Sequence, residues 1–124
     1  MALQVLIDKR HEYRDQAMVS INPKLKRIVI YKAAREMMIK HYRKAFETVL
    51  ILWDSKIKNA FWLRPCPPEE KGSRQLSATS DTTRTLSCRL LLQQLEWKGT
   101  KTERFPIAWD EKNDAARVDL SKSE

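Results

Sequence analysis

The stretch Lys26-Arg27-Ile28-Val29-Ile30-Tyr31 decides how the first half of the chain is expected to fold. Three β-branched residues followed by a tyrosine are typical of a buried strand. Ahead of this run, residues 17–21 favour one more strand, and Asn22-Pro23-Lys24 has the residue types of a turn between the two. The sequence therefore predicts a β-hairpin that leads directly into the segment after Tyr31.

A helix is expected from Lys32 to Ala45, because apolar side chains recur there at helical spacing. These side chains are Ala34, Met37, Met38 and Tyr42. The opposite face is basic and holds Lys32, Arg35, Lys40, Arg43 and Lys44. Beyond the helix, residues 48–53 and 59–64 predict a second hairpin that turns at Asp54-Ser55-Lys56. Residues 17–64 thus form one expected ββαββ unit.

A weak internal repeat suggests a second unit of the same kind. Trp53-Asp54 aligns with Trp109-Asp110 at an offset of 56, and residues 28–64 then give six identities in 37 pairs. The order of expected elements also matches: strands over 74–79 and 85–87, a helix over 88–97, and a hairpin of 104–109 with 115–120. Ser87 is the expected N-cap and Gly99 the expected stop of that helix. The tryptophans of the repeat are expected as packing anchors, and Asp54 and Asp110 as turn residues.

The segment 65–73 separates the two units, since it holds three prolines and a glycine. The expected organisation is an N-terminal extension (1–16), a first unit (17–64), this linker, a second unit (74–120) and a tail (121–124). A chain of 124 residues is too short for two independent cores, so the two units are expected to share one.

Positive charge is concentrated in the first half of the chain. The formal net charge is +8, and residues 1–64 hold fourteen Lys and Arg against six Asp and Glu, whereas residues 65–124 hold ten of each. Such an asymmetry favours a nucleic-acid surface on the first unit alone. No apolar run is long enough for a membrane span, and the N-terminal apolar run meets charged residues too soon for a signal peptide, so a cytoplasmic protein without a membrane partner is expected.

The sequence offers no residues for catalysis or for a metal. Cys66 and Cys88 lack metal-ligand spacing and are expected as free thiols, and His11 and His41 lie in charged, surface-like segments. No phosphate-binding glycine loop, nucleophile elbow or HExxH motif occurs. A binding protein without enzymatic activity, cofactor, metal or small-molecule substrate is therefore expected.

The order of elements resembles the AbrB/MazE/SpoVT swapped-hairpin family. The resemblance rests on residues 26–31, on Ala34-Arg35 in the helix and on Val49-Leu50-Ile51-Leu52-Trp53-Asp54, and it covers residues 17–64 well and 74–120 loosely. In that family two units exchange hairpins to form one barrel-like core. The resemblance implies an α+β, mainly β fold, in which tandem ββαββ units form one swapped-hairpin-like, pseudo-dimeric barrel.

The family binds DNA through an arginine-rich face, and two of its positions can be carried over. Arg27 falls on the arginine that precedes the family's strand, and Arg35 on the first helix arginine, whereas Glu36 replaces the second. In the second unit Thr83 and Leu91 hold the positions of the two arginines. The resemblance therefore implies contact with DNA through the first unit, either asymmetrically or in a homodimer.

DNA binding of a transcription-regulator-like or antitoxin-like kind is the leading hypothesis. Cationic side chains neutralise phosphates of double-stranded DNA, and we expect these phosphate contacts to dominate. The candidate contact residues are Lys24, Lys26, Arg27, Lys32 and Arg35.

Two other binding functions stay open. The neutral second half favours a protein-interaction or structural module that keeps the fold without DNA binding, with Trp62 and Trp97 as exposed interface anchors. RNA binding would use Tyr31, Tyr42 and Phe61 as stacking platforms.

Overall fold

The computed structural model describes residue 3 and residues 16–121, and the fold within them is mostly β. Most of the expected N-terminal extension (1–16), including His11, lies outside the described residues; only residues 3 and 16 of it are described. Of the expected tail (121–124), only residue 121 is described. In chain order the elements are β1 (Met18–Asn22), β2 (Arg27–Ile30), α2 (Lys32–Tyr42), β3 (Thr48–Asp54), β4 (Ile57–Pro65), β5 (Arg74–Gln75), β6 (Ser77–Ala78), β7 (Arg84–Ser87), α3 (Arg89–Gln94), β8 (Glu103–Asp110) and β9 (Ala115–Asp119).

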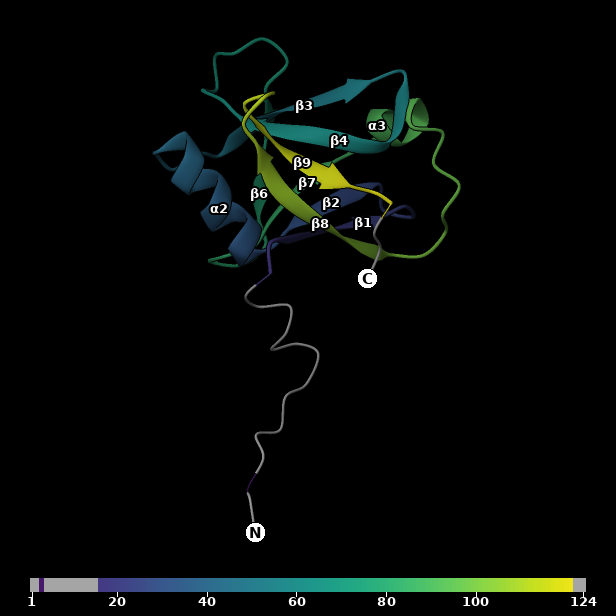
Figure 1. The fold of residues 1–124 in the computed structure, drawn as a ribbon, viewed down its shortest axis with the longest axis horizontal. Helices are drawn as coiled ribbons and strands as arrows, with labels where there is room; N and C mark the ends of the chain where they lie inside the picture. The colour runs from purple at the N-terminus through teal and green to yellow at the C-terminus, as the bar shows by residue number, and fades with distance from the viewer. Residues whose placement is uncertain (1–2, 4–15, 122–124) are drawn as a thin grey trace.

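All the strands join one antiparallel sheet that curls into a nearly closed barrel (Figure 1). The strand order is β5-β3-β4-β9-β8-β1-β2-β7-β6. Its two end strands, β5 and β6, are separated in sequence only by Leu76, which is buried and donates its backbone N–H to Glu47 O. The same short segment thus pairs with β3 on one side and with β7 on the other, which brings the two edges of the sheet together.

Strands from before and after the Pro-rich segment pair with each other around the barrel. β1 pairs with β8, β2 with β7, β4 with β9, and β3 with β5. The hairpins β1–β2, β3–β4 and β8–β9 are joined locally. Neither half of the chain therefore completes a sheet without the other.

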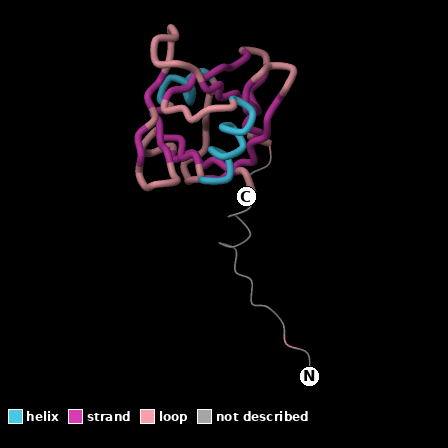
Figure 2. Tube along the Cα trace, turned by 90° about the vertical axis from the view of Figure 1, so that its left-hand side faces the viewer, coloured by secondary structure: helices cyan, strands magenta, loops and turns pink. Residues whose placement is uncertain are grey.

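One core fills the barrel and includes residues from both helices. Inward side chains alternate along the strands, as in β2, where Ile28 and Ile30 are buried and Val29 is only half-buried. Phe61 and Phe105 are the largest fully buried side chains. α2 adds Ala34 and Met38 to this core, α3 adds Leu91 and Leu92, and Leu95 directly after α3 is also buried there. The two helices lie at opposite ends of the barrel in Figure 1. They are also well separated in Figure 2, where α2 faces the viewer.

The helices are shorter than the sequence suggests. α2 ends at Tyr42 instead of Ala45, because Arg43 adopts a left-handed conformation (φ 70°) and donates its N–H to Ile39 O. α3 spans Arg89–Gln94 instead of 88–97.

The expected ends of α3 are wrong. Ser87 does not cap the helix, since it is the last residue of β7 and pairs with Arg27, and Cys88 holds the N-cap position. Gly99 does not end the helix either. The chain turns out of the helix before Gly99, at Glu96, whose backbone is left-handed (φ 55°).

The other sequence predictions have mixed outcomes. The strand expected over 74–79 is broken at Leu76, whereas Cys66 and Cys88 are confirmed as free thiols. Trp109 packs against the core as expected, but Trp53 is 40% exposed, so the anchor prediction is wrong for Trp53. In the described part of the chain, neither helix has the length and apolar character needed to cross a membrane.

Candidate nucleic-acid interface

The turn between β1 and β2 holds two of the five candidate residues, Lys24 and Lys26, and a third, Arg27, is the first residue of β2. The Asn22 side-chain oxygen accepts hydrogen bonds from the backbone N–H groups of Lys24 (3.1 Å) and Leu25 (3.0 Å). Pro23 restricts the backbone at the start of the same turn. The side chains of Lys24, Leu25 and Lys26 are consequently presented to solvent from a fixed backbone.

The start of α3 lies beside this turn. Cys88 donates its backbone N–H to Lys26 O at 2.8 Å, and Arg27 is the register partner of Ser87. Arg89, the first residue of α3, is exposed next to them. We define the turn patch as the four exposed cations Lys24, Lys26, Arg27 and Arg89. Its segments, 22–27 and 87–92, contain no acidic residue.

Lys26 occupies a backbone conformation that a lysine rarely adopts. Its φ is 55°, in the left-handed region where a side chain with a Cβ costs roughly 1–2 kcal/mol. Glycine or asparagine would fit this position with less strain. A lysine at this cost favours a role for its charge in the turn patch.

Lys32 does not join the turn patch. It follows β2 at the end opposite Arg27, about 16 Å away for five residues of extended chain. Its ammonium lies 4.0 Å from the Glu36 carboxylate, and both side chains are 64% exposed. The structure thus separates Lys32 from Lys24, Lys26 and Arg27.

Arg35 is engaged inside the protein instead of facing a ligand. Its Nη2 donates to Glu47 Oε1 at 3.4 Å, and its Nε is buried without a hydrogen-bond partner. Only 19% of its side chain is exposed. A phosphate or a base edge would have to compete with Glu47 for this guanidinium, so Arg35 is a poor contact residue.

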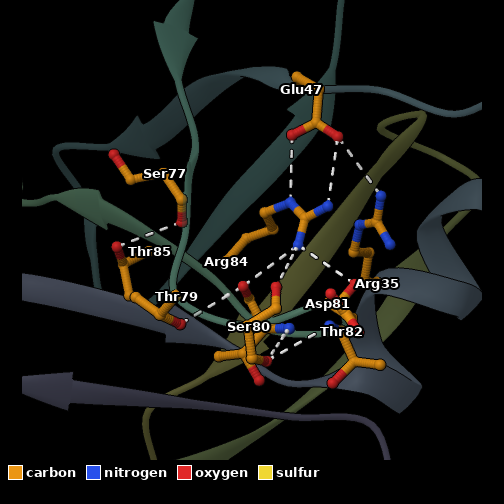
Figure 3. Close-up of polar contacts among 10 residues, drawn as sticks. Arg35, Glu47, Ser77, Thr79, Ser80, Asp81, Thr82, Arg84 and Thr85 are labelled. Atoms are coloured by element: carbon orange, nitrogen blue, oxygen red, sulfur yellow. Dashed lines mark hydrogen bonds and ion pairs between the residues drawn. The ribbon is translucent and has the colours of Figure 1, made fainter.

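Glu47 also binds Arg84, which sequence reasoning did not single out (Figure 3). Arg84 Nε donates to Glu47 Oε2 at 3.1 Å, and its Nη1 donates to the backbone carbonyls of Ser80 (3.1 Å) and Thr83 (3.2 Å). This guanidinium therefore holds the β6–β7 turn from inside. The network links α2, the start of β3 and β7.

A second group of cations lies at the end of α2. We define the helix patch as the exposed residues Lys40, Arg43 and Lys44. Lys40 lies in the last turn of α2, where a cation interacts favourably with the helix dipole, Arg43 is the C-cap residue, and Lys44 lies over the Tyr42 ring at 5.1 Å. The helix patch thus has a structural explanation that the turn patch lacks.

Trp62 and Trp97 are half-buried, so the prediction that they are exposed anchors is wrong. Trp62 Nε1 donates to Asp110 Oδ2 at 2.9 Å, and the Arg117 guanidinium lies 5.9 Å from its ring centre. Hydrogen bonds from Asn113 and Trp62 lower the pKa of Asp110. Trp97 packs edge-on against Phe105 at 5.7 Å.

The aromatic residues considered for RNA stacking do not form a platform. Phe61 is fully buried. The Tyr31 hydroxyl donates to Ser20 Oγ at 3.1 Å, and the Arg104 guanidinium lies 5.4 Å from its ring centre. Tyr42 packs edge-on against Phe46. Bases could therefore not reach the ring of Phe61, and other side chains already contact the rings of Tyr31 and Tyr42.

Among the described residues, His, Cys, Asp and Glu side chains do not gather in groups of three or more that would hold a metal ion. Comparison of the chain with protein-family models, curated proteins and solved structures gives no match.

Proposed function

We propose that this protein binds double-stranded DNA, as a transcription-regulator-like or antitoxin-like protein, through the turn patch. The observation that supports this proposal is that four exposed cations lie on two segments, 22–27 and 87–92, which a backbone hydrogen bond from Cys88 to Lys26 joins and which contain no acidic residue. Such a surface suits phosphate oxygens, which give affinity by counterion release. The protein acts by binding and not by catalysis.

We also propose that the fold is a fused form of the AbrB/MazE/SpoVT swapped-hairpin arrangement, with one ββαββ unit in each half. The pairing of β1 with β8, and of β3 with β5, supports an exchange of hairpins between the halves. The repeat offset of 56 also supports it, since α2 begins at Lys32 and α3 at Arg89, 57 residues later.

The second half supplies no equivalent DNA contact in this proposal. Its corresponding turn, over 79–83, contains Asp81 instead of lysines, and Arg84 beside it is buried against Glu47. One chain therefore presents one DNA surface. A palindromic site would require two chains.

A protein-interaction module is the second candidate, and one observation favours it. Leu25 is 62% exposed and Leu90 is 56% exposed, both within the segments of the turn patch. Exposed apolar side chains beside cations would also suit an acidic, apolar segment of a partner protein.

The test is fluorescence anisotropy with a labelled duplex of random sequence at about 50 mM salt. The double variant Arg27→Ala/Arg89→Ala should bind at least about tenfold more weakly than the wild type, because two phosphate contacts are lost. The matched control, Lys40→Ala/Lys44→Ala, removes the same charge from the helix patch and should stay within about twofold. No binding by the wild type would leave the interaction module as the better account.

A further inference from the structure

We propose that two copies of this chain form a dimer by pairing β3 with β3 in antiparallel fashion, across a two-fold axis at Leu52. The inference goes beyond DNA binding and does not depend on it, because residues 50–54 include no cation of the turn patch. It rests on an open edge of the sheet.

Most of β3 has a partner strand on one side only. β5 pairs with β3 at Thr48 and Val49, whereas β4 pairs with it between Val49 and Asp54. In Figure 1 the later part of β3 lies along the upper rim of the barrel. Within the described part of the chain, residues 50–54 therefore form an edge without a second neighbouring strand.

Two backbone hydrogen bonds fix which residues of β3 face this edge. Cys66 donates its N–H to Thr48 O on the β4 side, at 3.1 Å. Leu76 donates its N–H to Glu47 O on the β5 side, at 2.8 Å. Backbone groups alternate in direction along an antiparallel strand, so the even-numbered residues of β3 face β4 and the odd-numbered residues face β5 or the open edge.

Ile51 and Trp53 consequently direct their N–H and C=O groups toward the open edge. The register with β4 shifts between Leu52 and Asp54, but both of these pair with β4, so Trp53 between them keeps its direction. Among the described residues, neither Ile51 nor Trp53 has a backbone hydrogen bond outside the pairing of β3. A strand added at this edge would bond their four backbone groups.

A second copy of β3 supplies the matching groups. With the axis at Leu52, Ile51 of each copy lies opposite Trp53 of the other, and their backbones exchange four hydrogen bonds. An aromatic residue opposite a β-branched one is a favourable cross-strand pair. The two Leu52 side chains face each other at the axis, which lies at the middle of the stretch that β5 leaves open.

The composition of the edge favours this self-pairing over a charged partner. Residues 49–53, Val-Leu-Ile-Leu-Trp, hold no charge that would select an acidic or a basic peptide. Monomeric proteins commonly protect an edge strand with lysine or proline, and β3 has neither. Trp53 is 40% exposed in the single chain, and Leu50 and Leu52 are half-buried. The dimer would cover these apolar side chains.

Sedimentation velocity of the full chain at up to about 100 μM tests for the dimer. The wild type should show a concentration-dependent equilibrium between monomer and dimer. Leu52→Lys should weaken the dimer at least about tenfold, because two like charges meet at the axis and two apolar contacts are lost. The matched control, Leu25→Lys, adds the same charge at an exposed leucine outside β3 and should leave the dissociation constant within about twofold.

A cysteine cross-link tests the register. Opposite residues of a pair without hydrogen bonds have Cα atoms about 4.5 Å apart, which allows a disulfide. Leu52→Cys should therefore form a reducible covalent dimer under a mild oxidant. Asp54→Cys should not, since its two copies would lie about 13 Å apart along the strands. The wild type, in which Cys66 and Cys88 are buried, gives the background.

A wild type that stays monomeric over this concentration range would overturn the inference, and so would a dimer that Leu52→Lys leaves intact. Faster cross-linking of Asp54→Cys than of Leu52→Cys would contradict the register, and oligomers larger than a dimer would contradict a closed two-fold contact. Thermal unfolding checks that Leu52→Lys is folded, and if it is not, the cross-link of Leu52→Cys decides. These measurements contain no DNA, so their failure is separate from failure of the proposed function.

Discussion

Lys26 is subject to two opposing effects at the scale of a single residue. Its charge contributes to the turn patch, and its left-handed backbone (φ 55°) opposes folding. Replacement by glycine separates the two effects, because glycine adopts this conformation without a Cβ clash.

We expect Lys26→Gly to raise the free energy of unfolding by about 1 kcal/mol and to weaken binding to duplex DNA. Urea unfolding and anisotropy measure the two quantities. Lys24→Ala is the control, since it should weaken DNA binding without stabilising the fold. Unchanged DNA binding by Lys26→Gly would show that the lysine charge is not used.

Cys88 links stability to pH. Burial raises the pKa of its thiol from about 9 to about 11, partly offset by the nearby Arg74 guanidinium. Because the folded chain keeps this proton to a higher pH than the unfolded chain, the free energy of unfolding falls as pH rises from about 9 to about 11.

Cys88→Ala should lose less stability than the wild type over that interval. The wild type should lose about 2–3 kcal/mol more of its free energy of unfolding over this interval than Cys88→Ala does, which is the equivalent of two pKa units. Chemical denaturation at several pH values measures it, and comparison with the wild type removes the contribution of lysines and tyrosines. Parallel pH profiles for the two chains would contradict this account of Cys88.

Sequence patterns do not distinguish cations that face solvent from those that face the protein. Arg27 and Arg35 both matched family positions, yet Arg27 is exposed and Arg35 is paired with Glu47. Lys26 and Arg89 are 63 residues apart in the sequence, and only the pairing of β2 with β7 brings their segments together. The sequence alone therefore could not place Arg89 near Lys26. The candidate site was thus predictable only where its residues are neighbours in sequence.

At the scale of elements, Arg84 connects the β6–β7 turn to β3 and, through Glu47, to α2. Its side chain is 11% exposed, whereas that of Glu47 is 49% exposed, so the pair is only partly screened by water. Replacing Arg84 would leave the carbonyls of Ser80 and Thr83 without this donor.

Arg84→Ala should lower the free energy of unfolding by about 1–3 kcal/mol, since it breaks an ion pair with the half-exposed Glu47 and removes several hydrogen bonds to backbone carbonyls. Lys32→Ala, which removes an exposed partner of Glu36, should change it by less than about 1 kcal/mol. Thermal or urea unfolding provides both values. An equal, small effect of the two substitutions would show that the network does not stabilise the barrel.

Element types follow from the sequence better than their ends do. The expected hairpins correspond to β3–β4 and β8–β9, because alternation and turn residues are local properties. The ends of α2 and α3 depend on left-handed residues, Arg43 and Glu96, that no propensity indicates. The break at Leu76 depends on its backbone bond to Glu47, a tertiary contact.

At the scale of the whole molecule, the shared core was expected from chain length, and the mainly β fold from the resemblance to the swapped-hairpin family. Pairings such as β1 with β8 join segments about 85 residues apart, and no local signal specifies such partners. A strand was expected over residues 74–79, but its role in closing the barrel depends on its pairing with β3 on one side and β7 on the other, which the sequence does not indicate.

The salt dependence of DNA binding tests the central claim most directly, since it counts the phosphates that the turn patch neutralises. For the four cations, log affinity should fall against log salt with a slope of about −3 to −4, and Lys24→Ala/Arg27→Ala should reduce that slope by about 2 in magnitude. Lys40→Ala/Lys44→Ala should leave it unchanged. A slope that responds to the helix-patch variant and not to the turn-patch variant, or no binding at about 50 mM salt, would contradict the claim.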